Sequence, residues 1–227
     1  SDYMVLMHPR VQGRSMQKIT RGTYAARLAA GPEDVAASQA FRTRVFRQTA
    51  DHPDHDTLDA RYDHMLIENQ QSGAVVCCFR MMSFATGADI DSCYSAQHYD
   101  LESLRAYPDP MVEMGRFCVD PAYRDPNILR MAWRAMSDYV EEKNARMLFG
   151  CSSFEGTEAE TYMDAFALLT ARHLAPSRWL PKVKAPKVFP FAKRLGLKRP
   201  EMKRPDMKRA VGRMPPLLRT YLAMGGW

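Results

Sequence analysis

Apolar and polar positions in the first part of the chain predict a strand followed by a helix. Residues 22–31, "GTYAARLAAG", are compatible with a short strand that ends at a Gly-Pro pair. Residues 32–48 begin with that proline and carry Ala37, Phe41 and Val45 four positions apart. This spacing gathers apolar side chains on one face of a helix, and proline is well tolerated in a first helical turn. We therefore expect a strand and then an amphipathic helix.

The next region predicts an acidic loop and a β-hairpin. Residues 51–63 are rich in aspartate and contain a proline, which is typical of a loop. Two apolar runs, "HMLIE" (64–68) and "AVVCCFRMM" (74–82), are separated by the polar turn "NQQSG", and this arrangement predicts two paired strands. Residues 83–110 show no clear period, apart from a short helical pattern in "DLESLRAY".

The second half of the chain repeats strand and helix patterns. Residues 111–119, "MVEMGRFCV", predict a strand, and Asp125 and Pro126 are favourable residues for the start of the following helix. The expected apolar stripe of that helix comprises Ile128, Leu129, Ala132, Trp133, Met136, Tyr139 and Val140. A strand at 145–151 and a helix at 158–174 follow. This order of elements indicates an α/β domain with a mixed central sheet.

Length and composition favour one globular enzyme-sized domain. A chain of 227 residues can bury one sizeable core, so a single domain over 1–227 is expected, and two small domains are the less favoured alternative. No apolar run approaches the roughly 18–20 residues of a membrane span, and the N-terminus lacks a signal-peptide pattern. The five cysteines form no CxxC pair, which favours free thiols in a reducing cytoplasm. His52 and His55 lie in a polar loop, and no metal is expected.

Positive charge is concentrated near the C-terminus. The net charge is +6, but residues 182–209 hold eleven Lys/Arg against two acidic residues, a local +9 that leaves about −3 for the remainder. Trp179, Phe189 and Phe191 lie in or beside this segment, which belongs to a Lys-rich, Pro-broken region at about 177–213. An acidic partner such as anionic lipid, nucleic acid or an acidic protein would fit. A solvated, Pro-broken surface segment is the alternative, and the composition alone slightly favours it.

Two charged residues in the strand at 111–119 suggest either a catalytic wall or a structural ion pair. Glu113 and Arg116 are three apart, so in a regular strand their side chains would face opposite sides. One charge would then enter the core at considerable cost unless it were paired. Gly115 could host a bulge, and a bulge would bring both charges to one face.

The turn after this strand is compatible with anion binding. A helix that starts directly after a strand presents free N–H groups and the positive end of its dipole. Arg124 lies beside that start, and Asn127 lies in the first turn. An ordinary strand–turn–helix unit without a ligand would show the same pattern.

Several motifs resemble known acyltransferases. The segment "EMGRFCV" resembles the E-x-S-R-F-x-V strand of acyl-homoserine lactone synthases. The segments "GRFCVDPAYRDPNILRMAW", "LFGCSSFEGT", "YMDAFALLTARHLAP" and "PPLLRTYLAMGGW" more closely resemble the ornithine-lipid N-acyltransferase family. The resemblance runs from about Tyr24 to the C-terminus. It implies a GNAT-like fold, with a mixed central sheet flanked by helices and two splayed adjacent parallel strands.

The resemblance implies four substrate-binding residues before the strand at 111–119, namely Arg42, Asp56, Asp59 and Arg80, and one acyl-binding residue, Phe46. The segment "FRTRVF" is similar to an R-x-x-x-F element and gives Arg42 and Phe46. The segment "DTLDARYDHMLI" gives Asp56 and Asp59, and a DH pair, Asp63 and His64, follows them. The segment "CFRMM" gives Arg80. The acids and Arg42 would bind or frame the amino-acid substrate, and Arg80 and Arg116 would hold its carboxylate or orient the acids. Arg80 lies inside an apolar strand, so it requires an acidic partner, either one of these aspartates or Glu113.

The implied chemistry is attack of an amine on a thioester. Glu113 would be the base, directly or through a water, and backbone N–H groups near the bulge would stabilise the oxyanion. The pantetheine arm would lie between strands 111–119 and 146–151. The expected acyl- and pantetheine-binding residues are Phe46, Phe117, Cys118, Val119, Arg124, Asn127, Cys151 and Ser152. "YRDPNI" contains no glycine to wrap a pyrophosphate, which favours acyl carrier protein over coenzyme A as donor, with no resident cofactor.

We therefore expect an N-acyltransferase that moves a (3-hydroxy)fatty acyl group from acyl carrier protein to ornithine, glutamine or lysine. An acyl-homoserine lactone synthase-like enzyme is the near alternative, and a non-enzymatic membrane- or nucleic-acid-binding module is the distant one. The expected location is cytoplasmic and peripheral on the anionic inner face of the membrane, without nucleic acid. Compared with the family that it resembles, the Lys-rich stretch 182–209 is longer and more basic, and the end at "MGGW" suggests a last strand that is missing or supplied differently.

Overall fold

The computed structural model describes residues 2–7, 18–47, 52–156, 158–186 and 206–227. The chain divides into two compact units. One unit combines residues 9–85 with 109–148, and the other combines 1–8, 86–108 and 149–227. We call them the sheet unit and the C-terminal unit, and each is described by itself. The prediction of a single domain over 1–227 stays a prediction.

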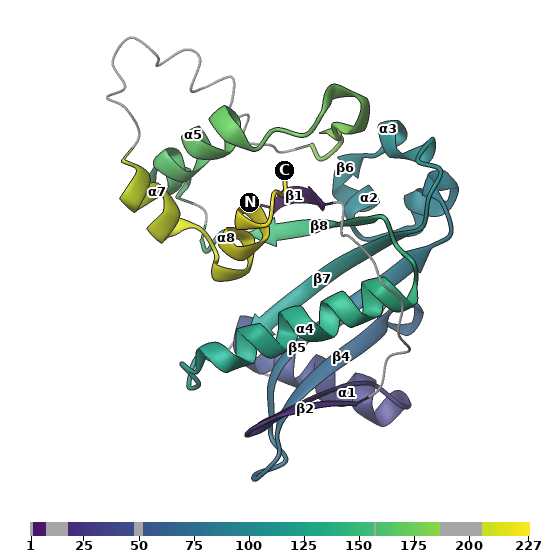
Figure 1. Cartoon of the computed structure of the whole chain (residues 1–227), viewed down its shortest axis with the longest axis vertical. Coiled ribbons are helices and arrows are strands. Elements are labelled where there is room, and N and C mark those ends of the chain that lie inside the picture. Colours follow the sequence, from purple (N-terminus) through teal and green to yellow (C-terminus); the bar gives the residue numbers. More distant parts are fainter. Residues whose placement is uncertain (1, 8–17, 48–51, 157, 187–205) are drawn as a thin grey trace. The chain divides into compact units, whose positions relative to one another are not determined.

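The sheet unit is built on five strands that pair antiparallel. In spatial order they are β7 (Met111–Val119), β5 (Val75–Phe84), β4 (Asp63–Asn69), β3 (Tyr24–Leu28) and β2 (Ile19–Arg21). In Figure 1, β7, β5 and β4 are the long central arrows, and β2 lies below them. The hairpin formed by β4 and β5, the strand at 111–119 and the strand within 22–31 are all confirmed.

The central strands of this sheet are buried on both faces. Consecutive residues Met65, Leu66 and Ile67 of β4 are fully buried, and seven successive residues of β5, Val76–Met82, are buried as well. Such runs require cover on both sides. Helices α1 (Pro32–Arg42) and α4 (Pro126–Glu142) pack against these strands, and in Figure 1 α4 crosses in front of the sheet while α1 lies behind it.

Helix α1 has a different buried face from the one its apolar spacing predicts. Phe41 is buried and Val45 is half-buried as expected, but Ala37 is exposed. Ser38 and Arg42 are buried instead. The helix begins with Pro32 and continues into a π-helical turn at Thr43–Arg47. Both side chains can face inward because each has a polar partner there. Ser38 contacts His64, and Arg42 binds Asp54 and Asp59.

Helix α4 begins where the sequence predicts. The Asp125 side chain accepts a hydrogen bond from the Asn127 N–H, and Pro126 occupies the first helical position. The expected stripe is partly wrong, because Leu129 and Trp133 are only half-buried. The residues buried under this helix are Ile128, Met131, Ala132, Ala135, Met136, Tyr139 and Val140.

The C-terminal unit contains short elements. Strand β1 (Asp2–Met7), which the sequence pattern does not predict, neighbours β8 (Met147–Ser153), whose first two residues belong to the sheet unit. β6 (Tyr99–Asp100) pairs antiparallel with β9 (Lys182–Val183). The remaining elements are η3 (Gly87–Ser92), α2 (Ser95–His98), α3 (Glu102–Arg105), η4 (Ala159–Tyr162), α5 (Met163–Arg172), η5 (Ser177–Trp179), α7 (Met207–Arg213) and α8 (Pro216–Ala223).

The amphipathic C-terminal segment is an internal helix. Leu218, Tyr221 and Leu222 on α8 are buried, so the apolar face of α8 belongs to the core of this unit. Exposed apolar side chains lie on the neighbouring helix α7, at Met207 and Val211. Most of the basic segment lies outside the described residues. None of the helices in the described part of the chain is both long and apolar enough to cross a bilayer.

Candidate functional site

The β7 strand carries the bulge that the sequence predicts. Arg80 of β5 is opposite Gly115, and Cys78 is opposite Cys118, so three steps on β7 match two on β5. The extra residue makes a bulge next to Gly115. The left-handed backbone conformation falls on Arg116, with φ of 53°, and not on Gly115. That conformation favours glycine, so an arginine there is strained.

The bulge brings Glu113 and Arg116 to one face of the sheet, as expected. Glu113 is fully buried and accepts a hydrogen bond from the Tyr62 hydroxyl. Arg116 donates from Nη2 to Oδ2 of Asp56 at 3.3 Å, and its Nη1 lies 3.6 Å from Oδ2 of Asp54. The loop at 54–62 therefore contacts both β7 residues.

Arg80 has the acidic partners that its position in an apolar strand requires. Its Nη1 and Nη2 donate to the two carboxylate oxygens of Asp56 at 2.8 and 2.9 Å, and Nη1 also donates to Asp59 at 2.6 Å. Burial by itself would lower the pKa of Arg80, but the hydrogen bonds and charges of both aspartates raise it above its ordinary value. The guanidinium therefore stays charged inside the protein.

Arg42 connects helix α1 to the acidic loop from within. Its side chain is 1% exposed. Nη1 and Nη2 donate to Asp59 at 3.0 and 2.7 Å, Nε donates to Asp54 at 3.1 Å, and Nη2 also donates to the Asp54 carbonyl at 2.7 Å. Because each guanidinium nitrogen is bonded within the protein, we assign Arg42 a structural role in place of the expected direct contact with substrate.

Asp59 is the acidic centre of this cluster. It accepts hydrogen bonds from Arg42, Arg80 and the Gln39 side chain at 2.9 Å. Burial would raise the pKa of Asp59, but Arg42 and Gln39, followed by Arg80, hold it well below its usual range. Asp59 is buried, so it fixes the arginines and does not present an open carboxylate to a ligand.

His64 is part of the same interior network. Its Nε2 lies 2.9 Å from the Asp59 carbonyl oxygen and its Nδ1 lies 3.3 Å from Oγ of Ser38. Burial lowers the pKa of His64. The ring is therefore neutral at pH 7 and supports the loop, so it is not positioned as a base toward solvent.

Asp56 and Arg116 are the accessible members of the cluster. Their side chains are 27% and 25% exposed, whereas Arg42, Asp54, Asp59 and Arg80 are sealed inside. Burial would raise the pKa of Asp56, but Arg80 and Arg116 lower it. Across the cluster, three arginines (42, 80, 116) contact three aspartates (54, 56, 59). The accessible edge offers one acidic and one basic side chain, which would suit a zwitterionic ligand.

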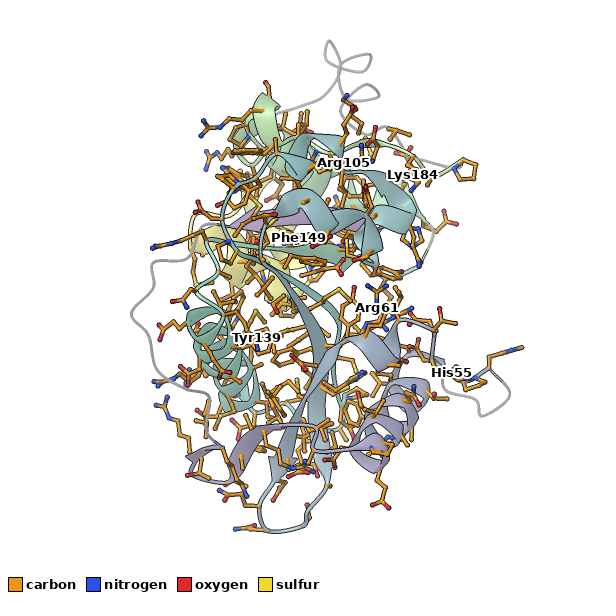
Figure 2. All side chains as sticks on the ribbon, turned by 90° about the vertical axis from the view of Figure 1, so that its right-hand side faces the viewer. His55, Arg61, Arg105, Tyr139, Phe149 and Lys184 are labelled. Carbon is orange, nitrogen blue, oxygen red and sulfur yellow. The ribbon has the colours of Figure 1, made fainter. Side chains whose placement is uncertain are left out.

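Sequence reasoning did not identify three members of this site. Asp54, Gln39 and Tyr62 are all brought in by contacts that are distant along the chain. Tyr62 directly follows the turn η2 (Asp59–Arg61) in the string "DARYDH", and no local periodicity marks it. In Figure 2, Arg61 of that turn lies on the opposite side of the sheet from Tyr139 of α4.

The expected acyl-binding residues of the sheet unit lie in two environments. Cys118 is buried, with its Sγ 3.6 Å from Sγ of Cys78, and Val119 is half-buried. Phe117 is half-buried, and its ring lies 5.8 Å from that of Phe79. Phe46 is 45% exposed on the π-helical turn. The exposed ring of Phe46 is available to an apolar ligand.

The N-terminus of α4 is already partly satisfied. The Asp125 carboxylate accepts from the Asn127 N–H at 2.9 Å, and its carbonyl oxygen accepts from the Ile128 N–H at 3.1 Å. An acidic side chain therefore caps the helix end at which an anion was expected. Arg124 and Asn127 are exposed, so Arg124 is the positive group available at this turn.

Cys151 and Ser152 lie on the part of β8 that belongs to the C-terminal unit. Both are half-buried, and Sγ of Cys151 lies 3.4 Å from Oγ of Ser95. Their contribution to the acyl site stays a prediction, as does the splay of strands 111–119 and 146–151.

Comparisons with known proteins identify the family. Residues 39–134 match the family described as "Acetyltransferase (GNAT) domain", which confirms the expected fold class. The chain is 31% identical to the L-ornithine N(alpha)-acyltransferase of Rhodobacter capsulatus over 220 residues, 90% of this chain and 82% of that protein. The enzyme of the same name from Agrobacterium fabrum is 28% identical over 90% of this chain and 73% of that protein.

Among solved structures, a GCN5-related N-acetyltransferase from Kribbella flavida aligns with a TM-score of 0.40 and 14% identity over 70% of this chain and 51% of that one. That structural similarity is weak, and the assignment rests on the sequence relatives. The chain belongs to the L-ornithine N(alpha)-acyltransferase family and is an N-acyltransferase with a GNAT domain.

Proposed function

We propose that the protein transfers a (3-hydroxy)fatty acyl group from acyl carrier protein to the α-amino group of ornithine or a closely related amino acid. Sequence relatives that are named L-ornithine N(alpha)-acyltransferases support the acceptor class. The observation that carries the proposal is the bulge in β7, which places Glu113 and Arg116 on one face beside Asp56. The product would be the first intermediate of an ornithine-type aminolipid.

The accessible edge of the cluster matches the charges of a basic amino acid. The Arg116 guanidinium would bind the α-carboxylate, since planar carboxylates suit the donor fork of arginine. Asp56 would bind the side-chain ammonium of ornithine. The buried ion pairs of Arg42, Asp59 and Arg80 hold these two groups in place. A site with one accessible charge of each sign favours a substrate with both charges.

Glu113 would act as the base. Because its carboxylate is buried, it takes the proton from the α-ammonium group through a bridging water, and the neutral amine nitrogen then attacks the thioester carbonyl carbon. As the C–N bond forms and the C–S bond breaks, the nitrogen loses a second proton and the departing thiolate gains one, which gives an amide and a thiol. The register places Arg116 and Phe117 opposite the single residue Phe79, so their backbone N–H groups are our candidates for stabilising the oxyanion.

The turn between β7 and α4 supports a carrier protein as the donor. "YRDPNI", residues 123–128, contains no glycine, and Asp125 occupies the helix end where a pyrophosphate would bind. The single phosphate of a pantetheine arm requires fewer backbone N–H donors than a pyrophosphate, and the exposed Arg124 can supply a positive charge to it. Carrier proteins are acidic, so the basic surface of this chain would favour their approach.

The protein would also bind an anionic membrane surface at its C-terminal unit. On α7, Met207 and Val211 are exposed one helical turn apart, and Lys208 and Arg213 are exposed beside them. Apolar groups flanked by positive charges are typical of helices that bind the lipid interface. Because the apolar face of α8 is buried, α7 is the better candidate of the two.

The experiment that tests the proposed reaction offers the purified protein a panel of free amino acids. The 3-hydroxyacyl carrier protein and the matching acyl-coenzyme A are supplied in separate reactions, and products are identified by mass spectrometry. We expect an N-acyl amino acid with ornithine preferred and the carrier protein as the better donor. The variant Asp56→Asn should lose the preference for ornithine over amino acids with neutral side chains. Equal use of all acceptors by the unaltered protein would contradict the assigned role of Asp56.

A further inference from the structure

We infer that Tyr62 is a positioning residue, which holds the carboxylate of Glu113 in the orientation needed to take a proton from the acceptor amine. The Tyr62 hydroxyl donates to Oε2 of Glu113, and both side chains are buried. The inference rests on the proposed function, because it takes Glu113 to be the base. It adds a residue from the acidic loop to a reaction otherwise assigned to β7.

The end of the acidic loop fixes the backbone of Tyr62. The residue follows the turn η2 directly, and its N–H donates to the Asp59 carbonyl at 3.3 Å. The next residue, Asp63, begins β4. Tyr62 is therefore anchored between a turn that holds the arginines and a central strand of the sheet. A rigid anchor is what a residue needs in order to orient a neighbour.

The Tyr62 side chain is held at both ends. The guanidinium carbon of Arg80 lies 4.5 Å from the centre of the Tyr62 ring, and Arg80 itself is fixed by Asp56. A planar cation over an aromatic face is an attractive contact, and it is stronger where water is excluded. The ring is thus fixed by Arg80 and the hydroxyl by Glu113. This arrangement connects the substrate-binding cluster to the base through one side chain.

A phenol is a suitable partner for a carboxylate that must accept a proton. A buried carboxylate without a donor is costly, so Glu113 requires a hydrogen bond. Arginines hold Asp56 and Asp59, and these contacts lower the pKa of both aspartates and make them poor proton acceptors. The Tyr62 hydroxyl is a neutral donor. It orients Glu113 without the full positive charge that would keep the carboxylate from accepting a proton.

The test compares Tyr62→Phe with Tyr139→Phe. Tyr62→Phe removes the hydroxyl and keeps the ring against Arg80. Tyr139 is a matched control, because its hydroxyl donates to Oδ2 of Asp63 at 2.6 Å in the same unit and on the other side of the sheet. We expect kcat for acyl transfer to fall roughly tenfold in Tyr62→Phe, with the KM for the acyl donor unchanged. The acidic limb of its pH–kcat profile should move upward by about one pH unit.

The charged groups of the neighbouring cluster are kept in both variants: Arg80 on β5, Arg116 on β7 and Asp56 in the loop. A shifted acidic limb in Tyr62→Phe and an unshifted one in Tyr139→Phe would therefore support the inference. Identical kcat and pH profiles in the two variants would overturn it. Glu113→Gln is measured in parallel. If Glu113→Gln kept full activity, both the proposed base and this inference would be wrong. If Glu113→Gln were inactive and Tyr62→Phe had normal activity, only the inference would be overturned.

Melting temperatures show whether the variants are folded. Should Tyr62→Phe not fold, Glu113→Asp tests the same contact from the other partner, since it withdraws the carboxylate from the phenol by one methylene. The inference then predicts a lower kcat and the same upward shift of the acidic limb. An unchanged kcat and profile in Glu113→Asp would overturn it.

Discussion

Arg42 and Asp59 are joined by two parallel hydrogen bonds of 3.0 and 2.7 Å inside the sheet unit. The pair connects helix α1 to the loop whose other residues contact β5 and β7. A two-point contact of this kind fixes both the distance and the orientation of its partners. The accessible residues Asp56 and Arg116 therefore depend on a buried ion pair.

Removal of Arg42 should destabilise the protein strongly. Arg42→Met leaves Asp59 and Asp54 buried without their main partner, and a loss of about 3–5 kcal/mol in the free energy of unfolding is expected. Arg44→Met is the matched control, because Arg44 is exposed and pairs with Asp120 at the surface. That change should cost less than about 1 kcal/mol. Urea denaturation measures both values, and equal midpoints for the two variants would contradict the structural role of Arg42.

Stability should fall in two stages as the pH is lowered. The pKa of His64 is lowered by burial, so below its ordinary value of about 6.5 the unfolded chain binds a proton that the folded protein does not, and stability declines. The pKa values of Asp56 and Asp59 are lowered too. Their contribution to the free energy of unfolding is therefore complete above the ordinary pKa of 3.8, and it is lost as the pH falls through their pKa values in the folded protein. Each group changes the free energy of unfolding by at most about 1.4 kcal/mol per pH unit.

Unfolding by urea at a series of pH values checks this prediction, with His64→Gln as the comparison. The variant should lose the first stage and keep the second. If the unaltered protein showed constant stability from pH 7 to pH 3, the assigned ionisation states of the cluster would be wrong.

Two replacements of Arg116 should separate backbone strain from chemistry. Arg116 has φ of 53°, which glycine adopts without penalty and alanine does not. Arg116→Gly should therefore be more stable than Arg116→Ala by about 1 kcal/mol, while both lose acyl transfer because the guanidinium is gone. Gly115→Ala serves as the control, since no atom lies within 4 Å of the added Cβ. Thermal melting would contradict the bulge if alanine were the more stable replacement.

Helix α7 should contribute to binding of anionic vesicles. At low salt, vesicles that contain phosphatidylglycerol are expected to sediment the protein, and high salt should release it because exposed charges are screened. The double change Met207→Ser and Val211→Ser should reduce the bound fraction severalfold. It should leave acyl transfer to a free amino acid unchanged. If neither salt nor these substitutions changed the bound fraction, the result would argue against a membrane-docking surface on α7.

Local patterns were sufficient for β3, β4, β5, β7 and β8 and for the start of α4, but not for β1 or the short strands β2, β6 and β9. β7 runs from Met111 to Val119, as the sequence predicts, because apolar and β-branched residues there are bounded by Pro110 and Asp120. A bulge at Gly115 was one local possibility, because in a regular strand one of two charges three apart would face the core; a paired buried charge was the other. Arg80 lies inside an apolar strand and therefore needed an acidic partner, which the sequence limited to the nearby aspartates or Glu113.

Features that depend on distant contacts could not be predicted in this way. The inward orientation of Arg42 depends on Asp54 and Asp59, and an apolar period along the helix gives no information about them. The contact between Tyr62 and Glu113 joins residues 51 positions apart. The family resemblance supplied Asp56 and Asp59 as members of the site, but the structure shows that only the first is accessible.

The most direct test of the account compares the unaltered protein with Glu113→Gln in one assay. Both are given 3-hydroxyacyl carrier protein and ornithine, and the rate of N-acylornithine formation is measured by mass spectrometry. Equal melting temperatures would establish that both are folded. We expect product from the unaltered protein and at least a roughly hundredfold lower rate from Glu113→Gln, because a glutamine amide cannot accept the amine proton. Equal rates in the two proteins, or no N-acyl amino acid from the folded unaltered protein, would contradict the account.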